Sequence, residues 1–93
     1  MDLGTSLRKN ARDEITVLSI IALSVQEVYK NITGNTVSVK SVQIKGKKIF
    51  IKTDNKLINS ELSLLVGNIH EILDMKITKL GFPSLKNMTL SFI

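Results

Sequence analysis

Apolar residues change their spacing twice along this chain of 93 residues, and these changes limit the folds that it can adopt. From Ile15 to Ile32 they recur at every third or fourth position, which is the spacing of one face of a helix. Gly34 follows shortly afterwards, and glycine is the common residue just past a helix end. The pattern predicts a helix over about residues 11–32.

A pattern typical of β-strands comes next. Two runs rich in valine and isoleucine lie on either side of Gly46, which predicts a hairpin with strands at about 37–45 and 48–53. The alternation slips by one residue inside the first run, so we expect a β-bulge near Ser41.

Helical spacing then returns over a long stretch. It predicts one helix from about residue 54 to Leu80, which Gly81 ends. The apolar stripe that we expect to face the sheet consists of Leu62, Leu65, Ile69 and Ile72. A last strand is expected at Met88–Phe92, where apolar and hydroxyl-bearing residues alternate.

The element order α-β-β-α-β predicts an α+β fold in which the long second helix packs on a three-stranded sheet. A chain of this length is the size of one domain, so we expect residues 1–93 to form a single unit. Residues 1–9 show no periodicity, and we expect them to form a flexible arm.

Composition excludes several kinds of site. The chain has no cysteine, and His70 is its one histidine, which excludes disulfides, thiolate sites and metal sites built from several histidines. The sequence contains no phosphate-binding glycine loop and no nucleophile elbow. We therefore expect a protein that is not an enzyme and that holds no metal and no cofactor.

The N-terminal segment is similar to a secretory signal, because basic residues precede an apolar run. However, Asp13 and Glu14 stand directly before that run, where signal peptides normally carry no acidic residue. The run is also about half the length that spans a bilayer. We expect a cytoplasmic protein without a membrane contact.

Basic residues give the strongest functional signal. The net charge of +5 favours an anionic partner, and nucleic acid is the first candidate. Six lysines stand within 17 residues, with Asp54 as the one acidic residue among them: Lys40, Lys45, Lys47, Lys48, Lys52 and Lys56. A second basic group consists of Arg8, Lys9 and Arg12. We expect these residues to contact the phosphates of DNA or RNA. The alternative is that the lysines guard an exposed sheet edge and that the N-terminal group only aids solubility.

Two aromatic residues have more than one interpretation. Phe50 stands in the second expected strand beside the lysines, where it either packs in the core or stacks on a base. The core is the commoner place for a phenylalanine in a strand, and we favour it here. Tyr29 is expected to pack between helix and sheet, with its hydroxyl near the surface.

Short motifs also occur in a set order: YKNITG at residues 29–34, KGKKIFIK at 45–52, INSEL at 58–62, and LG at 80–81 before the strand at 88–92. Together they resemble the first-helix ending, the hairpin, the Trp-Ala-x-Glu-Leu motif and the closing strand of the DciA family. Members of that family are bacterial proteins tied to loading the replicative helicase. The resemblance covers about residues 28–93.

The resemblance implies a KH-like fold, DNA binding and contact with the replicative helicase. Ile58 and Tyr29 stand where the family usually has tryptophan. No Gly-x-x-Gly loop lies between the expected helices, so the way in which KH modules clamp a nucleic-acid backbone is not carried over. Because the sequence ends at Ile93, we expect no longer partner-binding tail.

The sequence therefore predicts a small KH-like adaptor that binds DNA, single-stranded or duplex, and acts in the initiation of replication. Two alternatives remain open. One is an RNA-binding factor of KH-like fold that acts in ribosome assembly. The other is a protein-interaction domain that pairs through its sheet edge or an apolar helix face, with lysines that give only solubility.

Overall fold

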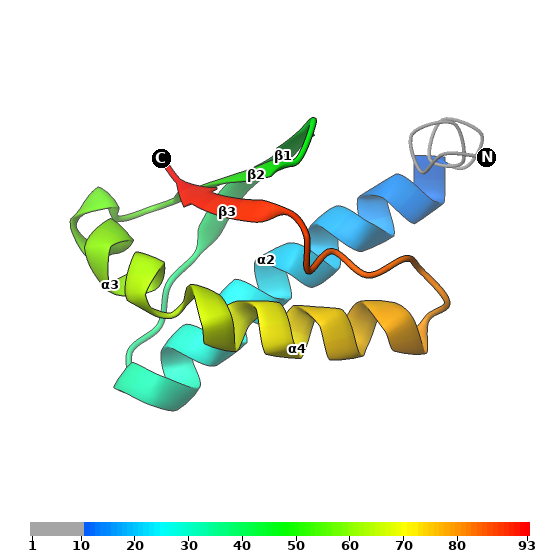
Figure 1. Cartoon of the computed structure of the whole chain (residues 1–93). Coiled ribbons are helices and arrows are strands. Elements are labelled where there is room, and N and C mark those ends of the chain that lie inside the picture. Colours follow the sequence, from blue (N-terminus) through cyan, green and yellow to red (C-terminus); the bar gives the residue numbers. More distant parts are fainter. Residues whose placement is uncertain (1–10) are drawn as a thin grey trace.

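The computed structural model describes residues 11–93, which form an α+β domain (Figure 1). The elements, labelled as in the figure, are α2 (Ala11–Thr33), β1 (Val39–Lys45), β2 (Lys48–Thr53), the 3-10 helix η1 (Lys56–Ile58), α3 (Asn59–Leu64), α4 (Val66–Lys79) and β3 (Thr89–Phe92). The expected arm at residues 1–9 lies outside the described residues. The predicted α+β class with a three-stranded sheet is confirmed, and the region predicted as one second helix is divided into η1, α3 and α4.

The sheet has the strand order β1-β2-β3 and is mixed. β1 pairs antiparallel with β2, and β3 pairs parallel with the other side of β2. The helices α2 and α4 lie together on one face of this sheet, and α3 lies beside the end of the sheet near β3 (Figure 1). The other face carries no described helix.

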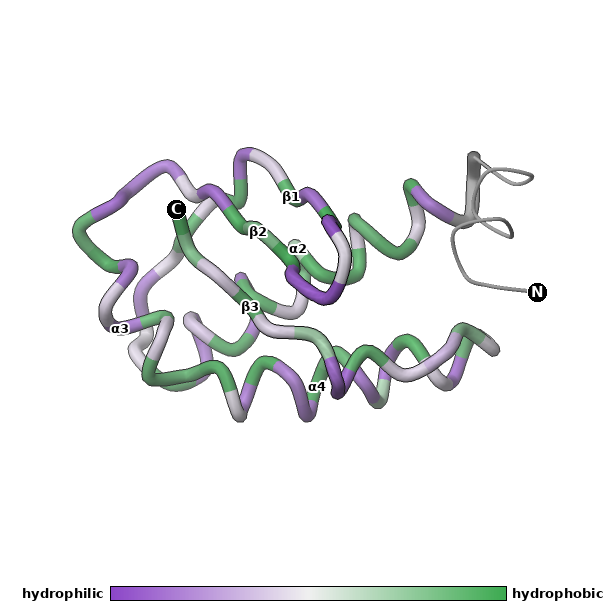
Figure 2. Tube along the Cα trace, turned by 45° about the horizontal axis from the view of Figure 1, so that its top comes forward, coloured by the Kyte–Doolittle hydropathy of each residue, from purple (hydrophilic) through white to green (hydrophobic). Residues whose placement is uncertain are grey.

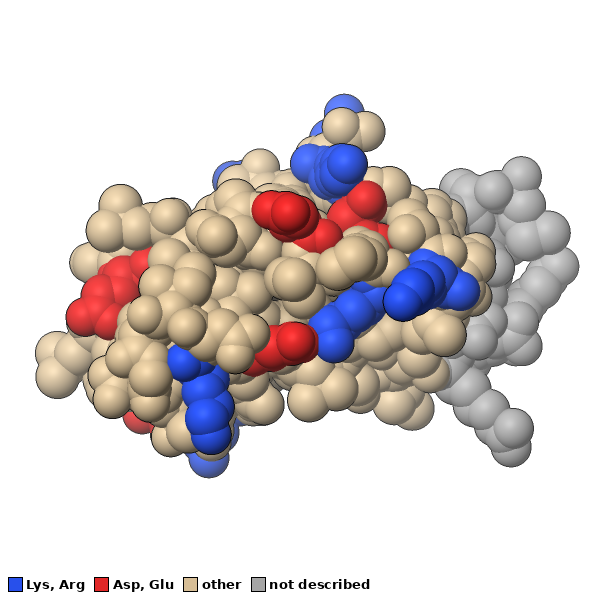
Figure 3. Space-filling view, turned by 90° about the horizontal axis from the view of Figure 1, so that it is seen from below, with Lys and Arg blue, Asp and Glu red and all other residues tan. Residues whose placement is uncertain are grey.

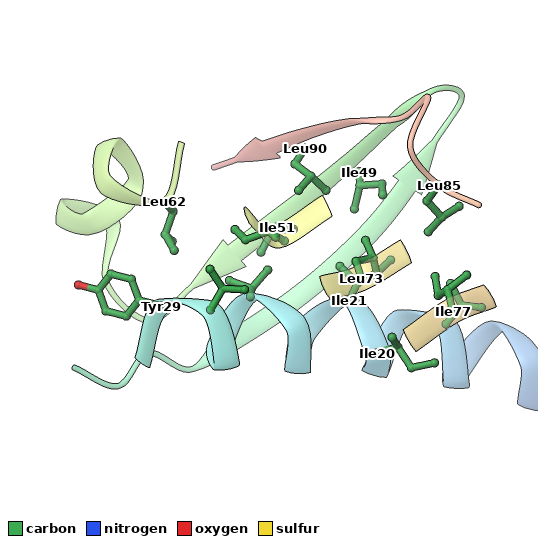
Figure 4. Close-up of a cluster of buried hydrophobic side chains, with 14 of the residues drawn as sticks. Ile20, Ile21, Tyr29, Ile49, Ile51, Leu62, Leu73, Ile77, Leu85 and Leu90 are labelled. Carbon is green, nitrogen blue, oxygen red and sulfur yellow. The ribbon is translucent and has the colours of Figure 1, made fainter. Parts of the chain in front are cut away.

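The core lies between the sheet and the two long helices. Ile49 and Ile51 of β2 are fully buried and point toward the helices, as does Leu90 of β3 (Figure 4). Side chains from both helices meet them: Val17, Ile21, Val25 and Val28 of α2, and Ile69, Leu73 and Ile77 of α4. Burial of this apolar area is the main force that holds the two layers together.

The hairpin agrees closely with its prediction. Gly46 has a φ of 59°, a left-handed conformation that glycine adopts without strain, and it turns the chain from β1 into β2. Val39 pairs with Thr53 and Ser41 pairs with Lys52, so Lys40 is the extra residue of a bulge. The predicted bulge is therefore confirmed.

The prediction of one long second helix is wrong. Leu65 has φ −97° and ψ 6°, which is outside the helical range, and it separates α3 from α4. The break lets α3 pack against β3 while α4 packs against α2. A straight helix points in one direction and cannot make both contacts.

The break also changes the apolar stripe. Leu62 and Ile69 are fully buried as expected, but Leu65 and Ile72 are only half-buried. Their expected places in the core are taken by Leu73 and Ile77, both fully buried.

α2 passes the length and composition test for a membrane-crossing helix. Its buried residues, including Ile21 and Val25, pack against the sheet and α4. Apolar residues along one stripe of a helix are also typical of a helix that packs on a globular core. In this structure α2 is such a core helix.

Candidate nucleic-acid interface

The sheet face away from the helices is polar and basic. Side chains alternate along a strand, so the burial of Ile49 and Ile51 places Lys48, Phe50 and Lys52 on the opposite face. The pairing register extends this surface across the sheet. We call it the open face, and it consists of Ser41, Gln43 and Lys45 of β1, Lys48, Phe50 and Lys52 of β2, and Thr89 and Ser91 of β3.

The open face has a regular layout. Lys45 of β1 stands directly opposite Lys48, at the end of the sheet next to the hairpin turn. Phe50 stands in the middle of the central strand, between Gln43 on one side and Ser91 on the other. Neighbouring strands are about 4.8 Å apart, and residues two apart along a strand are about 6.6 Å apart. Polar side chains therefore surround one aromatic ring, at distances that a single bound nucleotide could span.

The charge on this face has one sign. None of the three strands contains an acidic residue, and Lys45, Lys48 and Lys52 are exposed. No ion pair joins any of these lysines to an acidic side chain in residues 14–93. The nearby Asp54 accepts a hydrogen bond at 3.3 Å from the backbone N–H of Ser38. Adjacent ammonium groups repel one another, and a polyanion relieves that repulsion.

The opposite, helical side of the molecule has a different charge pattern. There acidic and basic side chains are mixed (Figure 3). Lys76 Nζ lies 2.9 Å from Glu27 Oε2, and Lys86 Nζ lies 3.5 Å from Asp74 Oδ2. The positive charges of these lysines are partly neutralised by their partners. The contrast leaves the open face as the better site for an anion.

The structure brings together four of the six clustered lysines. Lys47 lies in the hydrophilic turn at the tip of the hairpin, next to Lys45 and Lys48 (Figure 2). Lys40, at the bulge, lines a shallow groove between β1 and α2. Lys56 is exposed on η1, beyond the end of β2. Lys40 and Lys56 therefore lie outside the open face.

The structure shows little of the second basic group. Arg8 and Lys9 lie outside the described residues. The backbone of Arg12 lies in the first turn of α2.

Phe50 corrects the prediction that favoured the core. It is half-buried and does not belong to the residues that pack on the hydrophobic core. The three successive apolar residues Ile49, Phe50 and Ile51 hide the alternation, so sequence alone does not show which of them face outward. A sequence signal was nonetheless present, because Lys48 and Lys52 stand two residues to either side of Phe50 and share its face.

His70 is half-buried on α4, away from the open face. Among residues 14–93, no group of three or more histidine, cysteine, aspartate or glutamate side chains is arranged to hold a metal ion. The described side chains thus offer the open face as the strongest candidate site.

Comparison of the chain with protein-family models, with curated proteins and with solved structures finds no match.

Proposed function

We propose that this domain binds nucleic acid through the open face and the hairpin turn beside it. The observation that carries the proposal is a sheet face with three exposed lysines and no acidic residue. Lysines that contact phosphates release condensed counterions, which gives affinity for any sequence. The turn adds Lys47 to the same end of the sheet.

The resemblance to the DciA family supports DNA as the polymer and the replicative helicase as a protein partner, in the cytoplasm. In this proposal the domain is an adaptor without catalytic activity. Two exposed leucines support a protein contact near α3. Leu57 is 90% exposed and Leu64 is 84% exposed, and exposed apolar side chains are a common component of protein interfaces.

The nucleic-acid contact is tested with the double variant Lys48→Ala, Lys52→Ala. Both residues are exposed on the central strand, so the fold should remain intact. Fluorescence anisotropy with a labelled oligothymidine of about 20 nucleotides measures the affinity. We expect the loss of two phosphate contacts to weaken binding about tenfold or more at low salt.

The matched control is Lys30→Ala, Lys79→Ala. These lysines are exposed in the last turns of α2 and α4, and the double variant removes the same charge from the helical part of the molecule. Binding should change much less than in the Lys48, Lys52 variant. Equal weakening in both variants would show that net charge alone, and not the open face, holds the ligand.

The protein contact needs a separate test. A purified replicative helicase is passed over the immobilised domain after nuclease treatment, and retention is compared with that of the variant Leu57→Ser, Leu64→Ser. We expect retention by the unaltered domain and a loss in the variant. Absence of retention by the unaltered domain would remove the helicase from the proposal.

The preference for DNA is tested by competition. Unlabelled RNA of the same length and base composition should displace labelled DNA less well than unlabelled DNA does. Stronger displacement by RNA would favour an RNA-binding factor instead.

A further inference from the structure

We propose that Phe50 is a base-stacking platform and that the ligand of the open face is a single strand, not a duplex. This inference rests on the proposed function, because it identifies the form of the nucleic acid that the same face binds.

The position of Phe50 supports a direct role in binding. It stands at the centre of the middle strand, with Lys48 and Lys52 on either side along the strand. Its cross-strand neighbours are Gln43 and Ser91, both polar. The side chain is half-buried but does not pack on the hydrophobic core. The core therefore does not explain a large aromatic residue at this place.

The chemistry around the ring fits one class of ligand. A phenyl ring on a sheet surface offers a flat apolar area on which a base can stack, whatever its sequence. The lysines on either side of the ring are placed to contact the phosphates that precede and follow the stacked nucleotide. The amide of Gln43 and the hydroxyl of Ser91 can donate to or accept from the edge of that base.

A duplex does not fit this arrangement. In a double helix each base face is already covered by its neighbours, and a ring on a sheet surface reaches only the sugars, the phosphates and the base edges. A single strand can turn a base out and lay it on the ring. The aromatic ring thus adds affinity for a single strand and none for a duplex.

The test compares Phe50→Leu with the unaltered domain on two strands of equal length. One is oligothymidine, and the other is an abasic strand with the same phosphates. The unaltered domain should bind oligothymidine about fivefold or more tightly than the abasic strand. The variant should bind both strands as the unaltered domain binds the abasic one. Its affinity for a duplex of the same length should not change.

A second variant reports stacking without depending on affinity. The chain has no tryptophan, so Phe50→Trp introduces a single indole fluorophore. Oligothymidine should quench this fluorescence, and the abasic strand should leave it almost unchanged. Phe82→Leu serves as the aromatic control, because Phe82 packs against the core and should not affect the preference for bases.

The outcomes separate the two proposals. If the unaltered domain binds both strands equally, with normal salt dependence, the lysine interface stands and the stacking role is wrong. The same conclusion follows if Phe50→Leu keeps its preference for oligothymidine. If the unaltered domain binds neither strand, the proposed function fails, and the stacking role fails with it.

Discussion

Tyr29 connects the first helix to the start of the second helical region. Its side chain is almost fully buried, at 3% exposed, and its hydroxyl donates a hydrogen bond of 3.0 Å to Glu61 Oε2 on α3. The hydroxyl lies at the rim of the core and its ring lies within it (Figure 4). Burial raises the pKa of the Tyr29 hydroxyl, and the hydrogen bond and the negative charge of Glu61 raise it further.

Alkaline unfolding should therefore depend on Tyr29. An unfolded tyrosine ionises near pH 10, whereas the folded hydroxyl keeps its proton to higher pH. The stability that this group contributes is complete below about pH 10 and declines as the pH rises toward the folded-state pKa. Urea unfolding of Tyr29→Phe should show a lower stability at pH 7 and a shallower decline of stability above pH 10. Equal slopes in both proteins would contradict this role.

Single residues also show where the sequence was sufficient to predict the placement of a side chain and where it was not. The position of the Tyr29 hydroxyl near the surface was predicted correctly, because an amphipathic ring in a helix stripe has one end that prefers water. The outward direction of Phe50 was not predicted. The apolar run from Ile49 to Ile51 hides this direction, although Lys48 and Lys52, which share the face of Phe50, carry a signal for it.

At the level of elements, the division between α3 and α4 decides which residues stabilise the core. Leu73→Ala should destabilise the domain by about 2–5 kcal/mol, because it leaves a cavity at a fully buried position. Leu65→Ala, at the half-buried break, should cost clearly less. Thermal unfolding of both variants measures the difference. A larger loss of stability in Leu65→Ala than in Leu73→Ala would contradict the break and favour the continuous helix that the sequence predicts.

Gly67 lies near the start of α4 and not at the break. A Cβ atom added there would meet no other heavy atom within 4 Å, and its φ is not in the left-handed region. Gly67→Ala should therefore stabilise the domain by about 0.4–1 kcal/mol, because it restricts the unfolded chain. Gly46→Ala is the contrasting variant and should destabilise, since the turn requires a φ of 59°. In chemical denaturation, the midpoint should shift to higher denaturant concentration for Gly67→Ala and to lower concentration for Gly46→Ala.

Local patterns predicted most elements, and contacts between distant segments decided the rest. The first helix, the hairpin and the bulge depend on residues close in sequence, and each has its expected bounds to within two residues. The break at Leu65 depends on α3 and α4 packing against different elements. The helical spacing of apolar residues continues through Leu65, so the sequence shows no sign of the break.

For the whole molecule, the distribution of charge predicts the salt dependence of binding. Four clustered lysines lie on the open face or in its turn, while Lys40 and Lys56 lie elsewhere. Four phosphate contacts with a single strand give a slope of log K against log salt of about −2.8, and six give about −4.2. We expect the smaller slope in an anisotropy titration over salt. A slope near zero would show that binding involves no phosphate contacts.

The parallel pairing of β3 with β2 brings residues from two distant parts of the chain onto one surface. Thr89 and Ser91 complete the open face opposite Lys48 and Phe50. The lysine cluster could be predicted because it is contiguous in sequence. The contribution of β3 could not, since alternation predicts a strand but not its neighbour.

The bulge at Lys40 has a consequence for crowding. A protein without base preference coats its polymer, so that many copies stand next to one another along it. Free edge strands held at such density tend to join into a continuous sheet, and an irregular, charged edge prevents this. Lys40 interrupts the register of β1 at that edge and is exposed. If the domain binds a single strand as proposed, copies can therefore stand side by side along it without joining into a continuous sheet.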